Sequence, residues 1–278
     1  MNETVSVTDE EVASLSQSIL TRYGIDFTCY EPKSLKRRVV RLLLMNNFVS
    51  VHELWIRMLR DQSFIHTFMN EISVGMTSMF RDPIFWKHLK RLLTKNFTHT
   101  SQLSIWHAGC STGEEVYSLG ILLTETGLSQ KSTAFASDIN QDALEAARRG
   151  EYHKLRMIEN EQNFKEYNPY VDFARYYVPV DGKNVKMDEA LKKHVTFNYH
   201  NLINDPFTGK YDLILCRNVM IYFDTDAKQK LLRKFYDSLN PGGYLVIGFY
   251  DTMLSLIDQD LFTLADSDAK IFQKNLVS

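Results

Sequence analysis

The sequence predicts an α/β protein, in which a mainly parallel β-sheet domain follows a small all-helical N-terminal domain and carries a small inserted β hairpin. Two observations predict this class. From about residue 101, short apolar runs alternate with amphipathic helical segments, whereas residues 8 to about 70 show only the apolar spacing of helices. A chain of 278 residues can bury a full core, either in one large domain or in a small domain joined to a larger one.

The N-terminal domain is expected to be a small helical bundle. Its first helix follows Thr8 to Glu11, a capping-type start, and carries apolar side chains at helical spacing up to Leu20. The next helix, over residues 34–43, alternates a basic face with an apolar one, and a further helix is expected over 51–59. The basic face suits either an acidic partner or solvent, and composition alone favours solvent.

The sheet domain is expected to take its strands from short apolar runs that helices separate, which makes the sheet mainly parallel. The expected strands lie at residues 103–106, 134–136, 195–197, 212–216 and 244–247, and a last strand at 269–273 runs antiparallel beside its predecessor. The expected helices lie at residues 114–127, 141–149 and 225–239, and the third ends at the breaker Asn240-Pro241-Gly242-Gly243.

Between Gly150 and His194 the periodic pattern weakens. A hairpin is expected there, with strands at 176–180 and 185–187 around a turn at 181–184. The resulting domain boundaries are a helical domain over 1–72, a linker and connecting helix over 73–100, and a sheet domain over 101–278 with an insertion at about 165–190.

Composition excludes several classes of protein. Apolar residues make up 44% and charged residues 24% of the chain, which is ordinary for a folded globular protein. A formal net charge of -2 does not favour nucleic acid as a partner. The three cysteines lie far apart, without CxxC pairs or histidines at metal-ligand spacing, so we expect a reduced protein without a metal.

Targeting signals are also missing from the sequence. The polar, acidic start lacks the basic and apolar segments of a signal peptide. No stretch approaches the ~18 consecutive apolar residues that a membrane span needs. We therefore expect a cytoplasmic protein without membrane insertion.

The first chemical motif is a turn between a strand and a helix, over residues 105–118. Gly109 and the small side chains after it let a ligand approach the backbone, and the following helix begins with free backbone N–H groups. Glu114 and Glu115 suit a ligand with positive charge and disfavour the pyrophosphate of NAD or a nucleoside triphosphate. Because no Lys-Ser/Thr pair follows, the turn is not a P-loop.

The second motif is Asp138, at the end of the next expected strand, about 24 residues after the acidic pair. A carboxylate at this place can bind both hydroxyls of a ribose. A turn of this kind alone is weak evidence, but the turn and Asp138 in the right order predict a site for a cationic nucleoside. S-adenosylmethionine is such a ligand.

The third motif is the apolar strand that ends in Arg217 and Asn218. Ligands of open α/β sheets bind outside the carboxyl ends of the strands, so these side chains should face the same crevice as Gly109 and Asp138. Tyr222 lies further along, toward the place of a substrate. Its position alone equally fits a tyrosine that packs against the core.

Taken together, these motifs make the chain resemble the CheR-type chemotaxis receptor methyltransferases, bacterial enzymes that methylate glutamate side chains of chemoreceptors. The resemblance covers nearly the whole chain. It includes Thr77 with Phe80-Arg81-Asp82, residues 111–118 and 136–139, Asn201-Leu202, and the highly specific run at 216–223.

The resemblance implies a Rossmann-like S-adenosylmethionine methyltransferase sheet and a protein-glutamate O-methyltransferase activity, with S-adenosylhomocysteine as product and no metal. It implies that a set of side chains surrounds the cofactor, with Gly109 of the turn: Thr77, Arg81, Glu115, Asp138, Asn201, Leu202, Arg217 and Asn218. It makes Arg81 and Tyr222 the catalytic residues.

The resemblance also implies a partner, the cytoplasmic domain of a chemoreceptor, which a monomeric enzyme would methylate. The basic helix then becomes a substrate contact through Lys36, Arg37, Arg38 and Arg41. The inserted hairpin becomes a place where a receptor tail can add a strand.

The chain departs from the family pattern at three places. Gly75 replaces a usual asparagine, Met79 replaces a usual aromatic residue, and Gly248-Phe249-Tyr250-Asp251 replaces a usual Gly-His-Ser-Glu. The last departure keeps open a related methyltransferase with another protein or a small molecule as acceptor. A non-catalytic S-adenosylmethionine-binding signalling module is a further alternative, against which the presence of Arg81 and Tyr222 argues.

Overall fold

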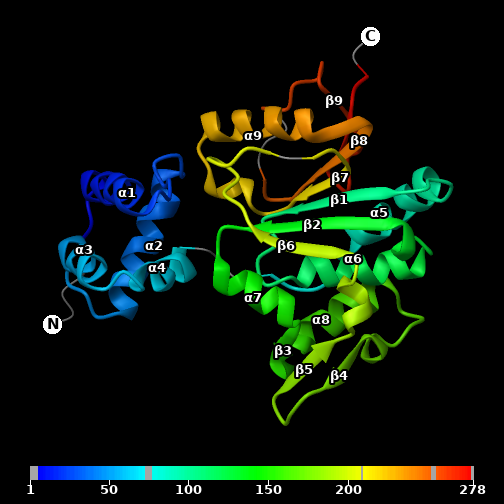
Figure 1. Cartoon of the computed structure of the whole chain (residues 1–278), viewed down its shortest axis with the longest axis horizontal. Helices are drawn as coiled ribbons and strands as arrows, with labels where there is room; N and C mark the ends of the chain where they lie inside the picture. Colours follow the sequence, from blue (N-terminus) through cyan, green and yellow to red (C-terminus); the bar gives the residue numbers. More distant parts are fainter. Residues whose placement is uncertain (1–5, 73–76, 208, 252–254, 277–278) are drawn as a thin grey trace.

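The computed structural model describes residues 6–72, 77–207, 209–251 and 255–276, and it contains a helical domain and a sheet domain (Figure 1). The helical domain consists of α1 (Asp9–Tyr23), α2 (Pro32–Met45), α3 (Val51–Arg60) and α4 (Phe64–Ile72). The expected capping box is confirmed, because the Thr8 side chain accepts from Glu11 and the Glu11 side chain accepts from Thr8. A separate apolar core, with Leu42, Leu54 and Phe68 at its centre, holds these helices together.

The sheet domain is built on a seven-stranded sheet of order β6-β2-β1-β7-β8-β10-β9. Its parallel strands are β1 (Leu103–Ala108), β2 (Ser132–Asp138), β6 (Val195–Tyr199), β7 (Tyr211–Cys216) and β8 (Leu239–Ile247). The strands β10 (Ile271–Lys274) and β9 (Phe262–Asp266) complete it, and β10 runs antiparallel to β8, as the sequence predicted. The α/β fold class is thereby confirmed.

Helices cover both faces of this sheet (Figure 1). On one face, α5 (Pro83–Phe97) and α6 (Glu114–Glu125) pack on side chains of β1, β7 and β8. On the other face, α9 (Thr225–Ser238) packs on the alternate side chains of the same strands. Because both faces are buried, β7 is apolar from Leu213 to Cys216, which is the signal that identified it.

The segment between α7 (Gln141–Arg149) and β6 corresponds to the stretch where the periodic pattern of the sequence weakens. It contains the predicted hairpin, formed by β4 (Tyr177–Pro179) and β5 (Asn184–Met187), which is confirmed as an antiparallel pair. The hairpin belongs to a three-stranded sheet with β3 (Glu151–His153), and α8 (Lys154–Tyr167) packs beside it. The sequence analysis missed α8, although its buried Met157, Asn160, Phe164 and Tyr167 recur at helical spacing.

Two further details of the sheet differ from expectation. The breaker over residues 240–243 does not separate α9 from a later strand, because β8 already begins at Leu239. The breaker instead forms an irregularity inside β8, where the register against β7 shifts and Gly242 has a positive φ of 74°. The edge strand β9 was not predicted, since three of its five residues are exposed and give no buried pattern.

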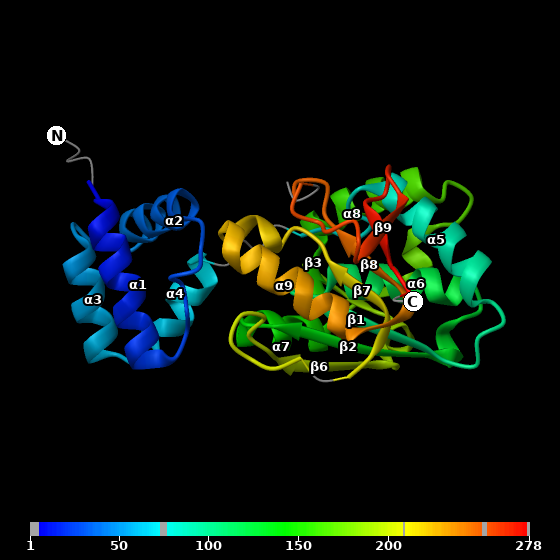
Figure 2. The ribbon, with the colours of Figure 1, turned by 90° about the horizontal axis from the view of Figure 1, so that it is seen from above.

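The helical domain lies beyond one end of the sheet domain, with α7 and α9 nearest to it (Figures 1 and 2). Residues 29–31 run against residues 222–224, with hydrogen bonds from Glu31 N to Tyr222 O (2.9 Å) and from Asp224 N to Cys29 O (2.9 Å). At a second point, Asn70 donates to Asp142 over 2.7 Å. The linker between these domains includes residues 73–76, which lie outside the described residues, and with them the departure at Gly75. Within the described ranges, no helix is both long enough and apolar enough to cross a membrane.

Candidate cofactor and methyl-transfer site

A cavity of about 320 Å³ lies at the carboxyl ends of β1, β2 and β7. This is where open α/β sheets bind ligands, and its size falls in the range of pockets for small molecules, roughly 300 to 1,000 Å³. Residues of the helical domain, Asp26, Tyr30, Asn70 and Ile72, also line it. The cavity is therefore built by both domains.

The turn after β1 forms one wall of this cavity. Gly109 has a φ of 86°, and its N–H, like that of Cys110, donates to Ser137 O at the end of β2 (2.8 and 2.9 Å). A Cβ atom on Gly109 would lie 2.5 Å from Val219 Cγ2. Glycine is thus required here both for its backbone conformation and for the close approach of the two loops.

Substitution Gly109→Ala is expected to lower the free energy of unfolding by about 1–3 kcal/mol, because alanine must adopt a left-handed conformation and displace Val219. Urea denaturation of the two proteins measures this loss. Gly182→Ala is the control, because a Cβ atom there meets nothing within 4 Å, and it should change stability by less than about 0.5 kcal/mol. Equal effects of the two substitutions would contradict this account of the turn.

Asp138 ends β2 and lines the same cavity. Its carboxylate accepts hydrogen bonds from the backbone N–H groups of Ser111 (2.8 Å) and Asn140 (2.9 Å), which fix its orientation. Burial raises the pKa of this carboxyl, and hydrogen bonds from the backbone N–H groups of Asn140, Ser111 and Ile139 partly oppose that shift. Each oxygen keeps a lone pair for a further donor, so the side chain can accept hydrogen bonds from two neighbouring hydroxyls.

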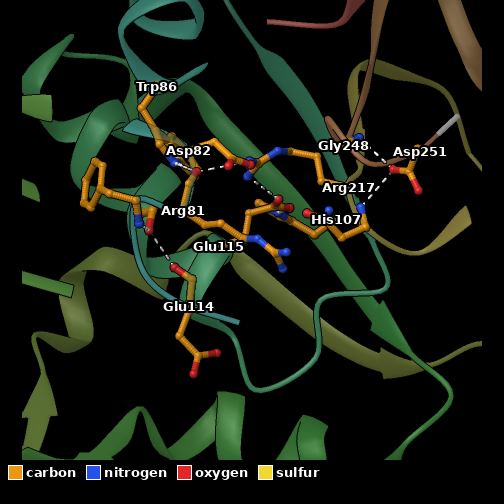
Figure 3. A network of polar contacts seen from close by, with 12 residues as sticks. Arg81, Asp82, Trp86, His107, Glu114, Glu115, Arg217, Gly248 and Asp251 are labelled. Atoms are coloured by element: carbon orange, nitrogen blue, oxygen red, sulfur yellow. Dashed lines mark hydrogen bonds and ion pairs between the residues drawn. The ribbon is translucent and has the colours of Figure 1, made fainter. Parts of the chain in front are cut away.

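Arg217 lies at the centre of a buried polar network that joins the linker to the sheet (Figure 3). Its side chain is 3% exposed, and Nη2 contacts Asp82 Oδ2 at 2.8 Å while Nη1 contacts Glu115 Oε2 at 3.3 Å. Nη2 also donates to Arg81 O (3.1 Å), and the guanidinium stacks over the Phe85 ring at 4.1 Å. The end of β7, the start of α5 and the start of α6 are thereby held together by one side chain.

The two acidic residues of the turn have different surroundings, which corrects the expectation that both face the ligand. Glu115 lines the cavity, and the hydrogen bond from His107 and the charge of Arg217 outweigh its burial and hold its pKa below the usual value. Glu114 is 1% exposed and contacts Thr112 and, on α8, Arg156 instead. Figure 3 shows it pointing away from the Arg217 network. Burial raises the pKa of Glu114 to about 7, so Glu115 carries the negative charge of this wall.

The remaining predicted cofactor residues come together in the same cavity: Thr77, Arg81, Asn201, Leu202 and Asn218 all line it. Asn218 has a positive φ of 59°, and its Nδ2 atom is buried without a hydrogen-bond partner within the described ranges. The polar side chains of this lining fit a polar nucleoside ligand. In the part of the chain that the structure describes, His, Cys, Asp and Glu side chains form no group that could hold a metal.

Tyr222 lines the cavity, and its backbone carbonyl is tied to Glu31 of the helical domain. The guanidinium of Arg38, on α2, stacks on the Tyr222 ring at 4.4 Å and donates to Ile72 O. Arg38 is 7% exposed, so it belongs to the contact between the domains, not to the free basic face on which the sequence analysis placed it.

The other three predicted substrate contacts on α2 are more accessible. Arg37 is exposed and has no partner among the described residues. Lys36 pairs with Asp9 at 2.7 Å, and Arg41 lies 3.8 Å from Glu71 with its side chain 70% exposed. The basic face of α2 that solvent reaches therefore consists of Lys33, Arg37 and Arg41.

Some residues of the site were missed by the sequence analysis. Asn70 and Tyr30 reach the cavity from the helical domain, and His107 holds Glu115 from within β1 at 3.1 Å. No spacing rule relates the first two to the turn, because their contact depends on how the domains meet. Asp251 belongs to the departure from the family pattern at residues 248–251, and that departure was the only indication of its importance in the sequence.

Family models match almost the whole chain. A model described as "CheR methyltransferase, SAM binding domain" matches residues 75–271, and one described as "CheR methyltransferase, all-alpha domain" matches residues 10–73. The second covers the helical domain and the first covers the cavity wall from Thr77 onward.

Relatives of similar length support the same assignment. A Pseudomonas putida protein, named only provisionally as the methyltransferase Cher3, is 34% identical over 268 residues, 96% of this chain and 98% of that protein. The "Chemotaxis protein methyltransferase" of Listeria innocua is 30% identical, covering 87% of this chain and 89% of its own length. The protein of that name from Escherichia coli is also 30% identical, with 89% of this chain and 86% of that protein covered.

Among solved structures, the chain is similar to the N-methyltransferase NodS from Bradyrhizobium japonicum in complex with S-adenosyl-L-homocysteine. The identity is 12%, the match covers 72% of this chain and 89% of that one, and the TM-score is 0.41. This likeness is too distant to add to the assignment. On the family models and the relatives, the chain belongs to the CheR methyltransferase family, and its sheet domain is an S-adenosylmethionine-dependent methyltransferase domain.

Proposed function

We propose that this chain is a cytoplasmic protein-glutamate O-methyltransferase that methylates glutamate side chains on the cytoplasmic domain of a chemoreceptor. One observation carries the proposal: Arg81 and Tyr222 line the same cavity as Asp138, Glu115 and Asn218, at the contact between the two domains. A protein acceptor can approach such a site along the helical domain. The relatives named as chemotaxis protein methyltransferases support this class of acceptor.

The proposed cofactor wall is assigned by chemistry. We assign Asp138 to the ribose hydroxyls, Asn201 and Leu202 to the base, and ionised Glu115 to the positive end of the ligand. Arg217 and Thr77 complete this wall, with Gly109 giving close backbone approach. S-adenosylmethionine supplies a methyl group on a sulfonium, which is transferred as the bond to sulfur breaks and its electron pair stays on sulfur.

The acceptor needs no general base, because a glutamate carboxyl with a pKa near ~4.3 is already ionised at neutral pH. The chain's own residues must then orient the carboxylate and exclude water. We assign these tasks to Arg81, through its positive charge, and to Tyr222, through its hydroxyl. The Arg38 guanidinium over the Tyr222 ring restricts where that hydroxyl can point.

Calorimetric titration with S-adenosylhomocysteine tests the cofactor wall. We expect the wild-type chain to bind, and Asp138→Ala to weaken binding by about 10- to 100-fold, since two hydrogen bonds to a charged acceptor are lost. Asp181→Ala is the control, because this carboxylate lies in the exposed turn of the hairpin and should leave binding unchanged. Unaltered affinity in Asp138→Ala would refute the assignment.

Methyl transfer from labelled donor to receptor-containing membranes tests the acceptor. Base-labile label on receptor glutamates, lost in Arg81→Ala and Tyr222→Phe variants that still bind S-adenosylhomocysteine, is the expected result. Label on another protein or a small molecule would favour the alternative acceptor that residues 248–251 leave open. Tight binding without transfer to any receptor or lysate component would favour a non-catalytic signalling module.

A further inference from the structure

The side-chain carboxylate of Asp251 connects the loop after β7 to the end of β8 through hydrogen bonds. Asp251 is 4% exposed, and its Oδ2 atom accepts hydrogen bonds from Gly248 N (2.7 Å) and Asn218 N (2.9 Å). Its Oδ1 atom accepts from Ile221 N at 3.0 Å (Figure 3 shows the first two). Three backbone N–H groups from two segments thus donate to the two oxygens of one buried carboxylate.

The segments meet closely at this point. A Cβ atom on Gly248 would lie 2.6 Å from Asn218 N and 2.8 Å from Asp251 Oδ2, so no other residue fits there without a shift. The backbone of Asn218 also takes a positive φ of 59°, a conformation that costs free energy in a residue other than glycine. The bond to Asp251 compensates that cost and fixes this conformation.

The residues that this carboxylate holds are those that face the cavity. Asn218 and Tyr222 both line the cavity, and Ile221 immediately precedes Tyr222. Glu31 and Arg38 of the helical domain contact Tyr222, and within the sheet domain Tyr222 N donates to Val219 O over 3.2 Å. The hydrogen bond from Ile221 N to Asp251 ties this turn to the end of β8, directly before Tyr222.

We propose that Asp251 is a positioning residue for methyl transfer, which acts through Asn218 on the cofactor and through Tyr222 on the acceptor. The acceptor part rests on the function proposed above, whereas the cofactor part does not. This role of Asp251 also accounts for the departure at residues 248–251. Phe249 and Tyr250 are exposed, whereas Asp251, the acidic residue at the end of this run, is buried. The departure from the family pattern thus keeps a carboxylate that accepts these hydrogen bonds and changes the exposed residues beside it.

Asp251→Asn is the test, because an amide keeps the shape but replaces one acceptor oxygen by a donor that faces backbone N–H groups. Asp251→Glu restores a carboxylate. Asp266→Asn is the matched control, since Asp266 also accepts backbone N–H bonds, from Asp268 (3.0 Å) and Ala269 (2.9 Å), but lies outside the cavity lining. All variants are assayed at a temperature where circular dichroism shows them folded.

The expected result separates positioning from stability. In Asp251→Asn, the dissociation constant for S-adenosylhomocysteine should rise about 10-fold and kcat should fall about 100-fold, as a displacement near 1 Å can cause. Amide exchange in residues 217–222 should accelerate, and Asp251→Glu should recover at least part of each loss. Asp266→Asn should be less stable yet keep the wild-type affinity and kcat.

Two results overturn the proposal: wild-type affinity and exchange in folded Asp251→Asn, or equal kinetic losses in Asp251→Asn and Asp266→Asn. If the wild-type chain methylates no receptor, the proposed acceptor is wrong. The affinity and exchange measurements then still decide whether Asp251 positions Asn218, so the two failures can be told apart.

Discussion

Substitution Arg217→Met is expected to lower the free energy of unfolding by about 3–5 kcal/mol. The side chain is 3% exposed, and its removal leaves two partly buried carboxylates, Asp82 and Glu115, without their cationic partner. Methionine can still fill the volume beside Phe85, so the loss isolates the charge and its hydrogen bonds. Urea denaturation followed by circular dichroism measures the change.

The control for this prediction is Arg57→Met. Arg57 pairs with Asp61 one turn along α3 at 2.8 Å, but its side chain is 51% exposed, so the loss should stay below about 1 kcal/mol. Arg217→Met should also weaken S-adenosylhomocysteine binding, because Glu115 loses its fixed orientation. If the variant were as stable as wild type, the free energy lost by removing the Arg217 charge from water would equal the free energy gained from its ion pairs. The network would then not stabilise the fold.

Glu114 is expected to make the stability of the protein fall as the pH rises toward neutrality. Burial raises its pKa from 4.5 to about 7, so the folded chain holds a proton that the unfolded chain releases. A raised folded-state pKa means that the contribution is fully present below pH 4.5 and is lost between 4.5 and 7. The total loss is about 3 kcal/mol, of which about 2 kcal/mol falls between pH 5.5 and 8.

Glu114→Gln tests this prediction, since glutamine stays neutral and can still accept from the Thr112 hydroxyl. Between pH 5.5 and 8, the free energy of unfolding of the variant should fall by about 2 kcal/mol less than that of wild type. The variant should also be more stable than wild type at pH 8. Glu159→Gln, at an exposed carboxylate on α8, should leave the pH dependence nearly unchanged. If Glu114→Gln were less stable at pH 8, the ion pair with Arg156 would outweigh burial, and the sign of the effect would be reversed.

The sequence by itself determined the order of elements and the chemistry of each motif. Both are local signals. The run from Leu213 to Cys216 in β7 is apolar because both faces of the strand are covered, and the capping box at Thr8 depends on residues three positions apart. The ordered pair of Gly109 and Asp138 needed only the rule that parallel strands end at the same edge. The family resemblance named the other cavity residues, because it carries information about distant positions that spacing lacks.

What tertiary structure alone decided is which of two neighbouring side chains faces the ligand and which faces the core. Glu114 and Glu115 are equivalent in composition, yet the start of α6 points the first toward α8 and the second toward the cavity. Arg38 likewise belongs to a basic stripe in the sequence but stacks on Tyr222, because α2 packs against the sheet domain there.

The same holds for the contacts that cross the chain. The hydrogen bonds from Asn218 and Ile221 to Asp251 and the contact of Asn70 with Asp142 join segments 30 to 72 residues apart, and no local pattern records such partners. The physical reason is that hydrophobic periodicity reports burial of a face, which is local, whereas a polar side chain is satisfied by whichever donor the packed chain brings within about 3 Å.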